Sequence, residues 1–278
     1  MNIEREYYEN DDFWKIETLG PHDSKRVAAL IAGIPDSVED IVEVGCGNGI
    51  FVNALKSGSR QGRTIIGIDR ALSALKYVRA PSVCASIDAL PLPDRSFDLV
   101  AALEILEHLP VKVYEAGLAE ICRLSRRYVM VSVPYKQDLR LSLIECPSCL
   151  GQFNPDYHMR SFDEGVLEKL LVNSGFACVR AFTIAPFQQF KGIAQIRAAT
   201  RRRAPASNPF PTAIPCPICG FYLEPAVSSA GATGSASSNG EAPANGRGIK
   251  SMIKKMWPQE TSFVWIAALY ERASAKGQ

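Results

Sequence analysis

A glycine-rich turn is the first feature of the sequence that could do chemistry. The stretch VEVGCGNGIF, residues 42–51, places Gly45, Gly47 and Gly49 between an apolar run and a helix-like pattern. Glycine tolerates a positive φ and lets a ligand approach the backbone. Such a turn delivers the ligand to the N–H groups at a helix N-terminus. The spacing is G-x-G-x-G rather than the dinucleotide-binding G-x-G-x-x-G, and a tight structural turn is the alternative interpretation.

Two acids follow the glycine turn at the ends of later apolar runs. Asp69 ends the run 64–69, about twenty residues after the turn, where a carboxylate can accept both hydroxyls of a ribose. Asp88 follows the run 81–87, where it could meet an adenine amino group. A helix cap or a solvated loop explains either acid alone. The glycine turn and both acids, at the ends of three successive runs, together favour a nucleoside-containing ligand.

Two C-P-x-C units, CPSC at 146–149 and CPIC at 216–219, form a second candidate site. A C-x-x-C turn brings two thiolates to one metal ion, and four thiolates form a closed, structural zinc site. We therefore predict a shared zinc site of Cys146, Cys149, Cys216 and Cys219. The 66 residues between the units exceed the usual zinc-ribbon spacing, and His158 competes as a fourth ligand. The remaining cysteines, expected to be small core residues, are Cys46, Cys84, Cys122 and Cys178.

Alternating apolar runs and helical patterns must position these residues. We predict strands at 41–44, 64–69, 81–87, 97–103, 128–134, 176–184 and 261–272. Helical spacing covers 23–34, 113–125 and 161–175; the last of these has a capping box of Ser161 and Glu164 and a terminal Gly175. This alternation indicates a mostly parallel sheet covered on both faces. The last strand should pair antiparallel beside the sixth.

The 278 residues divide into three predicted parts. Residues 1–40 form an N-terminal lid and helix. Residues 41–184 and 261–278 form the core. Residues 185–260 form an insertion that carries the second C-P-x-C unit, and its Ser-, Gly- and Ala-rich stretch 228–248 is predicted to be disordered.

Composition and charge restrict the partners. The apolar fraction of 47% suffices for a core, and the net charge of +2 argues against nucleic acid as the main partner. The basic run 197–203 is interpreted as a solvated surface, with an anionic substrate, a membrane surface or RNA as alternatives. Neither a signal peptide nor a membrane-spanning run is evident, so we expect a cytoplasmic protein with reduced thiols.

Four successive motifs resemble those of class I S-adenosylmethionine-dependent methyltransferases. They are VEVGCGNGIF, GIDRA, SIDALPLPDRSFDLV and ALEILEHLP. The later HMRSFDEGVLEKLLVNSGF resembles the segment that closes many small-molecule members. The resemblance covers residues 40–184 and the last strand. It implies an α/β fold, a Rossmann-like doubly wound seven-stranded sheet with the last strand antiparallel, and S-adenosylmethionine as cofactor.

Carried over residue by residue, the resemblance assigns the cofactor site to Glu43, Gly45, Cys46, Gly47, Gly49, Asp69, Arg70, Asp88, Ala89, Leu103 and Glu104. Glu43 and the glycines shape the methionine-binding turn, Asp69 holds the ribose, and Asp88 with Ala89 frames the adenine. The fourth strand ends beneath the sulfonium. The family often has Asp where Glu43 stands, and this exchange keeps the charge.

The N-terminal stretch EYYENDDFWKIETLGPHDSKR resembles the aromatic lid of small-molecule members. Its Tyr7, Tyr8 and Trp14 would close over cofactor and substrate, or would pack the first helix onto the core. His108, just past the fourth strand, is the candidate catalytic base, and its alternative role is to orient its loop. An alcohol acceptor would need a base, whereas an amine or an acidic hydroxyl would not.

These features together predict a methyltransferase that acts on an O or N of a small-molecule acceptor. A sugar, a lipid-linked intermediate or a secondary-metabolite intermediate would fit, with zinc in a structural role. One alternative is an RNA methyltransferase that uses the basic run 197–203. The other is a non-catalytic binding protein that kept the fold, against which the glycine turn and both acids argue.

Overall fold

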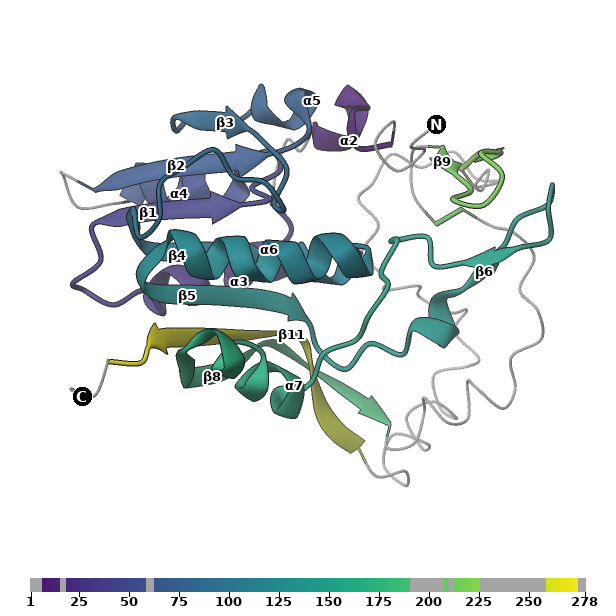
Figure 1. Cartoon of the computed structure of the whole chain (residues 1–278). Coiled ribbons are helices and arrows are strands. Elements are labelled where there is room, and N and C mark those ends of the chain that lie inside the picture. Colours follow the sequence, from purple (N-terminus) through teal and green to yellow (C-terminus); the bar gives the residue numbers. More distant parts are fainter. Residues whose placement is uncertain are drawn as a thin grey trace.

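A seven-stranded sheet forms the centre of the molecule, in the order β3-β2-β1-β4-β5-β11-β8 (Figure 1). This computed structural model describes residues 7–15, 19–58, 63–190, 208–209, 213–225 and 259–274. The strands are β1 (Asp40–Val44), β2 (Thr64–Asp69), β3 (Ser82–Cys84), β4 (Phe97–Leu103), β5 (Ser125–Pro134), β8 (Phe176–Phe190) and β11 (Gln259–Arg272). Neighbours from β3 to β5 are parallel, whereas β11 runs antiparallel to both β5 and β8. The predicted fold, with its antiparallel last strand beside the sixth, is confirmed.

Helices cover both faces of this sheet. On one face lie α3 (Pro21–Ala32) and α4 (Ile50–Gly58), and on the other lie α6 (Val111–Leu124) and α7 (Glu164–Lys169) (Figure 1). Successive strand residues point to opposite faces, so Ile41 packs in the core on the α4 side and Val42 in the core on the α6 side. Both residues are fully buried. Burial on both faces explains why the strands read as continuous apolar runs.

The helix predicted at 161–175 is shorter in the structure. It begins at Glu164, and its N-cap is Asp163, whose side chain accepts a hydrogen bond from the Val166 amide. The predicted capping box that starts at Ser161 is therefore wrong.

Other boundaries shift by a few residues. The segment after α7 continues in a 3-10 turn, η3 (Val172–Ser174), which ends at Gly175 with a φ of +80°. This conformation confirms the predicted terminal glycine, because the left-handed region favours that residue. β8 continues to Phe190 and β11 begins at Gln259, so both strands extend into the segment predicted as an insertion.

Two small hairpins carry the C-P-x-C units. β6 (Ile144–Glu145) pairs with β7 (Gln152–Phe153), and β9 (Ile214–Pro215) pairs with β10 (Tyr222–Leu223). Figure 1 shows β6 and β9 beyond the ends towards which β1 and β2 point. Their apolar residues form a third buried cluster together with Tyr7. The basic run 197–203 and the stretch 228–248 lie outside the described residues.

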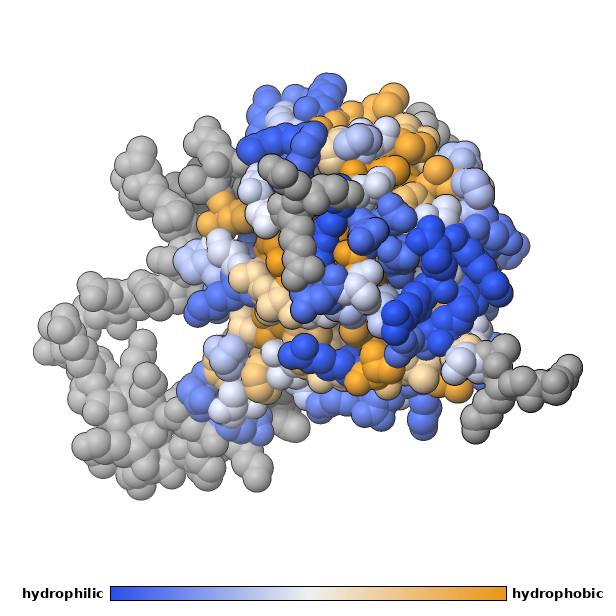
Figure 2. Space-filling view, turned by 90° about the vertical axis from the view of Figure 1, so that its left-hand side faces the viewer, coloured by the Kyte–Doolittle hydropathy of each residue, from blue (hydrophilic) through white to orange (hydrophobic). Residues whose placement is uncertain are grey.

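The opposite end of the sheet, where β1 and β2 begin, is largely polar. Figure 2 looks at this side and shows a broad hydrophilic area with smaller apolar groups between its parts. Near the starts of β4 and β5, Arg126 forms an ion pair with Asp98. The remaining elements are α2 (Asp11–Trp14), α5 (Leu72–Leu75), η1 (Leu106–His108) and η2 (Leu139–Ser142). Within the described ranges, no helix has the length and apolar character needed to cross a membrane.

Candidate functional site

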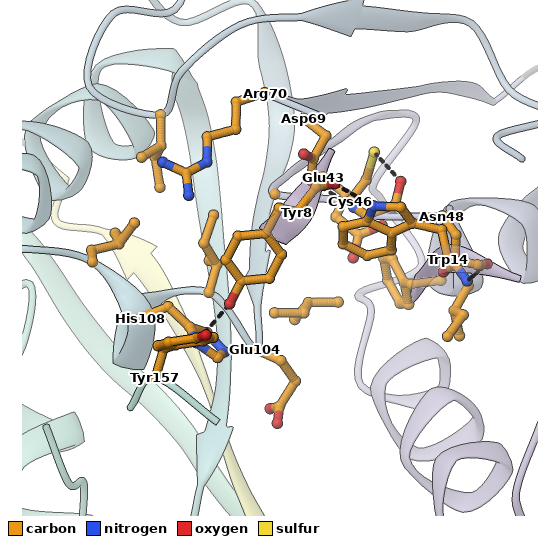
Figure 3. A pocket seen from close by; sticks show the side chains of 18 of the residues that line it. Tyr8, Trp14, Glu43, Cys46, Asn48, Asp69, Arg70, Glu104, His108 and Tyr157 are labelled. Atoms are coloured by element: carbon orange, nitrogen blue, oxygen red, sulfur yellow. Dashed lines mark hydrogen bonds between the residues drawn. The ribbon is translucent and has the colours of Figure 1, made fainter. Parts of the chain in front are cut away.

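A cavity of about 420 Å³ lies at the carboxyl ends of β1, β2 and β4 (Figure 3). The glycine turn, the N-terminal aromatic segment and residues 156–158 line it. The lining includes these predicted site residues: Glu43, Gly45, Cys46, Gly47, Asp69, Arg70, Leu103, Glu104 and His108. Gly49, Asp88 and Ala89 are not among its lining residues. Most residues assigned from the resemblance therefore meet in one pocket.

The glycine turn requires glycine for two separate reasons. Gly45 and Gly47 have φ values of +76° and +53°, in the region that other residues rarely adopt. A Cβ added to Gly45 would lie 2.1 Å from Ile105 Cδ1, and one added to Gly47 would lie 2.8 Å from Trp14 Cζ3. The Gly45 amide also donates to the Ile68 carbonyl at 2.7 Å, which fixes the turn against β2.

Asp69 connects the end of β2 to the glycine turn. One carboxylate oxygen accepts from the Gly47 amide and the other from the Ala71 amide, each at 2.8 Å. Burial raises the pKa of Asp69, while these two amides and Arg70 oppose the rise. A carboxylate with fixed amide partners at the pocket wall is well placed to accept hydrogen bonds from a ligand.

Glu43 is a buried acidic residue behind the glycine turn. The side chain is 4% exposed, and its Oε2 has no hydrogen-bond partner among the residues that the structure describes. Burial raises the pKa of Glu43 well above its usual range, although Arg26 acts against the rise. A buried acceptor without a partner is costly, and a ligand that donates a hydrogen bond would relieve it.

The pocket wall that follows β3 is formed by other residues than the predicted Asp88 and Ala89. Asp88 is exposed and its carboxylate accepts from the Ser86 hydroxyl, whereas Ala85, Ser86 and Ile87 line the pocket. Sequence reasoning missed these three residues. Their position immediately before the acid was the only available signal.

The N-terminal aromatic segment lies against the glycine turn. Trp14 Nε1 donates to the Tyr8 carbonyl at 2.7 Å, and Asn48 Nδ2 donates to the Trp14 carbonyl at 3.0 Å. Ser73, at the start of α5, donates to the same Tyr8 carbonyl at 3.0 Å. Figure 3 shows the Tyr8 ring pointing towards His108 and Trp14 lying beside Asn48 of the turn. The described part of the segment thus lines the pocket, and its role as a lid stays a prediction.

The far wall of the pocket holds two histidines. The Tyr8 hydroxyl lies 3.3 Å from His108 Nδ1, and the rings of His108 and His158 have centroids 4.5 Å apart. Burial, reinforced by His158, lowers the pKa of His108 to about 3, so its imidazole is neutral at neutral pH. His22 is exposed on α3, away from this wall.

Glu104 closes the pocket floor at the end of β4. Its Oε1 accepts from the Ser132 hydroxyl at 2.9 Å and lies 3.7 Å from Arg26 Nη1. Burial raises the pKa of Glu104, and the Arg26 charge partly offsets that rise.

The four cysteines of the C-P-x-C units meet as predicted. Their Sγ atoms all lie within 4.8 Å of one another, with Cys146–Cys219 at 3.7 Å and Cys149–Cys216 at 3.8 Å. Both units use the same turn, in which the amide four residues after the first cysteine donates to that cysteine's carbonyl at 2.9 Å. The residue at this position is Leu150 in one unit, and it has a positive φ like its glycine counterpart in the other.

The other cysteines and His158 lie elsewhere. Cys46 and Cys122 are buried and Cys178 is half-buried, but Cys84 is exposed, so the core prediction is wrong for Cys84. His158 faces His108 and is not part of the four-cysteine cluster. Its predicted competition for that site is therefore wrong.

Comparison with known proteins agrees with this geometry. Residues 42–129 match the family described as "Methyltransferase domain". The chain is similar to a probable S-adenosylmethionine-dependent methyltransferase of Mycobacterium tuberculosis H37Rv, at 30% identity over 149 residues, covering 51% of this chain and 50% of the relative. It is also similar to a ubiquinone biosynthesis O-methyltransferase of Paracidovorax citrulli, at 36% identity over 81 residues, covering 25% and 33%. The chain thus spans about half the length of the former relative and less of the latter.

Solved structures share the fold at low sequence identity. One is a complex between the Haloferax volcanii Trm112 methyltransferase activator and the putative methyltransferase, with a TM-score of 0.53, 14% identity and 100% coverage of both chains. Another is an S-adenosylmethionine-dependent methyltransferase from Archaeoglobus fulgidus, with a TM-score of 0.51, 16% identity and coverage of 91% and 95%. At these identities, the likeness establishes the fold.

Proposed function

We propose that this chain, which carries a class I S-adenosylmethionine-dependent methyltransferase domain, transfers a methyl group to an oxygen or nitrogen of a small-molecule acceptor. The observation that carries the proposal is the lidded pocket in which the glycine turn, Asp69 and the unpartnered Glu43 oxygen meet. The cofactor supplies a methyl group already activated on a sulfonium, so the protein has to bind, orient and exclude water.

The pocket residues fit this cofactor by their chemistry. The glycine turn lets a ligand approach the backbone, because it carries no Cβ at Gly45 or Gly47, and Asp69 offers a carboxylate for the ribose. Glu43 Oε2, which has no hydrogen-bond partner among the residues described, can accept from a ligand that donates a hydrogen bond. Ala85 and Ile87 give the pocket an apolar wall suited to a flat base.

Acceptor binding is assigned to the opposite wall. Tyr8 of the N-terminal segment points there towards His108, and Tyr157 lies beside them (Figure 3). The neutral His108 imidazole and the Tyr8 hydroxyl can orient an acceptor by hydrogen bonding. A base with a pKa near 3 accepts a proton readily only from an acidic group, so an acidic hydroxyl or an amine suits this site better than an alcohol.

A small acceptor is favoured over RNA by the shape and charge of the pocket. Its volume is about 420 Å³, and the aromatic segment covers it. Nucleic-acid binding relies on phosphate contacts from a strongly basic surface, whereas this chain has a net charge of +2. The function test is incubation of the full chain with methyl-labelled cofactor and a small-molecule extract, followed by mass spectrometry. A methylated small molecule is expected. Label transferred only to RNA, with steeply salt-dependent binding, would contradict the proposal.

The same proposal includes a structural zinc ion on the four cysteines. Zinc bound tetrahedrally at about 2.3 Å separates its sulfur ligands by about 3.8 Å. The sulfur–sulfur distances of 3.7 and 3.8 Å support this geometry. A closed four-thiolate site has a structural role and does not bind substrate. The zinc ion would link the two hairpins beside the acceptor wall.

Metal analysis tests the zinc proposal. About one zinc per chain is expected, and Cys216→Ser should lose it because a four-thiolate site would lack one ligand. Cys84→Ser is the matched control, since Cys84 is exposed and lies outside the cluster. A metal-free wild-type protein whose melting temperature equals that of the Cys216→Ser variant would contradict the proposal.

A further inference from the structure

A second group of metal-ligating side chains lies in the acceptor wall, separate from the cysteines. Ligand atoms of Glu107, His108 and His158 all lie within 4.8 Å of one another. Glu107 Oε1 is 4.0 Å from His108 Nε2. His108 and His158 line the pocket, so the group borders the space assigned to the acceptor.

Glu107 is the unexplained member of this group. Its side chain is fully buried, and neither carboxylate oxygen has a hydrogen-bond partner among the described residues. An acid in this position loses its hydration, and the charges of Arg26 and Arg160 offset that loss only in part. A cation bound between Glu107 and the histidines would give both carboxylate oxygens a direct partner.

The histidines are already held as metal-bound histidines usually are. His158 Nδ1 lies 2.5 Å from Gln137 Oε1, an amide oxygen that can only accept, so Nδ1 donates and Nε2 keeps its lone pair. His108 Nδ1 faces the Tyr8 hydroxyl, which can accept in the same way, and Nε2 lies 4.0 Å from Glu107 Oε1. The His108 ring also hydrogen-bonds the backbone of Asp156. Metal-binding histidines characteristically donate their second nitrogen to such an outer partner.

We propose that Glu107, His108 and His158 bind one divalent first-row cation, such as Mn²⁺, Fe²⁺ or Co²⁺, in the wall of the acceptor pocket. Two imidazoles and one carboxylate leave coordination positions open for exogenous ligands. Bound ligand atoms are separated by about 3 Å at neighbouring positions, so side-chain movements of about 1 Å would close the group around the ion. The open positions then accept an oxygen of the acceptor.

The consequence for catalysis rests on the proposed function. A hydroxyl bound to the cation becomes more acidic, which removes the need for a strong base at His108. Its proton passes to solvent water and its oxygen forms the bond to the methyl carbon. The carbon–sulfur bond breaks with its electron pair on sulfur, and S-adenosylhomocysteine leaves. The acceptor class is therefore an oxygen-bearing small molecule that can chelate a cation, such as one with neighbouring hydroxyls.

The test titrates Mn²⁺ into the full-length protein and follows the electron paramagnetic resonance signal of free Mn²⁺. Mn²⁺ is the probe because thiolates prefer softer ions, so the cysteine cluster should not take it up. One saturable site is expected, and Glu107→Gln and His158→Gln should each weaken it roughly tenfold or more. His22→Gln, the exposed histidine of α3, is the matched control and should bind as the wild type does.

Either of two results would overturn the inference: no saturable Mn²⁺ site up to about 1 mM, or undiminished Mn²⁺ affinity in His158→Gln. The half-buried His158 variant keeps the test valid if Glu107→Gln does not fold, which a melting curve will show. Calorimetry with S-adenosylmethionine on the same samples separates the two claims. Cofactor binding without cation binding refutes this inference alone, whereas absence of cofactor binding refutes the proposed function.

Discussion

At the residue scale, the features best predicted from sequence are those with a backbone requirement. The glycine turn was recognisable because only glycine satisfies both its positive φ angles and the close approach of Ile105 and Trp14. Asp69 was recognisable because it is the last residue of β2, and its role depends on that position. The proximity of Glu107 and His158 could not be predicted from the sequence, because the two residues lie in separate segments and no sequence spacing links them.

The glycine requirement gives a direct prediction. Gly45→Ala should lower the free energy of unfolding by about 1–3 kcal/mol, since the added Cβ collides with Ile105 and the backbone is left-handed. Cofactor affinity should fall with it. Gly58→Ala is the control, because no described residue comes within 4 Å of its Cβ position. Urea unfolding measures both variants, and equal losses in the two would contradict the account of the turn.

At the scale of elements, the order of strands and helices was predictable but some ends were not. The alternation of apolar runs identified all seven strands of the central sheet. The α7 cap was misplaced because Phe162 is buried and pairs with Tyr135, which keeps the chain extended past Ser161. A tertiary contact of this kind overrides a local capping pattern.

The start of α7 also carries a pH-dependent contact. The Tyr135 hydroxyl and Lys136, 3.0 Å away, lower the pKa of Glu164 to about 2. Because the folded pKa is depressed, this stabilisation is present above the unfolded value of about 4.3 and disappears as pH falls towards 2.

Glu164→Gln should therefore cost about 0.5–1 kcal/mol at pH 7, a small value because the pair is largely exposed. The difference from wild type should vanish near pH 2. Glu168→Gln, on the exposed side of α7, should have no such effect. Chemical unfolding across pH measures this, and a Glu164 effect independent of pH would refute the assignment.

At the scale of the whole molecule, the two hairpins connect the cysteine cluster to the pocket. Tyr157 donates to the Pro215 carbonyl at 2.6 Å, next to Cys216, and its ring packs edge-on against Tyr7. Sequence spacing could pair the C-P-x-C units, since each is a recognisable turn. It could not show that their apolar residues share a core with the N-terminal segment, because that contact joins distant parts of the chain.

Tyr157→Phe tests this connection. It leaves the buried Pro215 carbonyl without its donor, so the free energy of unfolding should fall by about 1–3 kcal/mol. The acceptor KM should rise because Tyr157 lines the pocket. Tyr222→Phe, on the exposed side of β10, is the control. Unchanged stability in Tyr157→Phe would show that the hairpins and the pocket are not connected through this contact.

The central claim is that the pocket at the carboxyl ends of β1, β2 and β4 binds S-adenosylmethionine through the glycine turn and Asp69. Isothermal titration calorimetry of the cofactor into the full chain tests it most directly. The account predicts one site per chain, with affinity reduced at least tenfold, about 1.4 kcal/mol or more, in Asp69→Asn and unchanged in the exposed control Asp36→Asn. Absence of binding at high micromolar cofactor, or equal affinity in both variants, would contradict it.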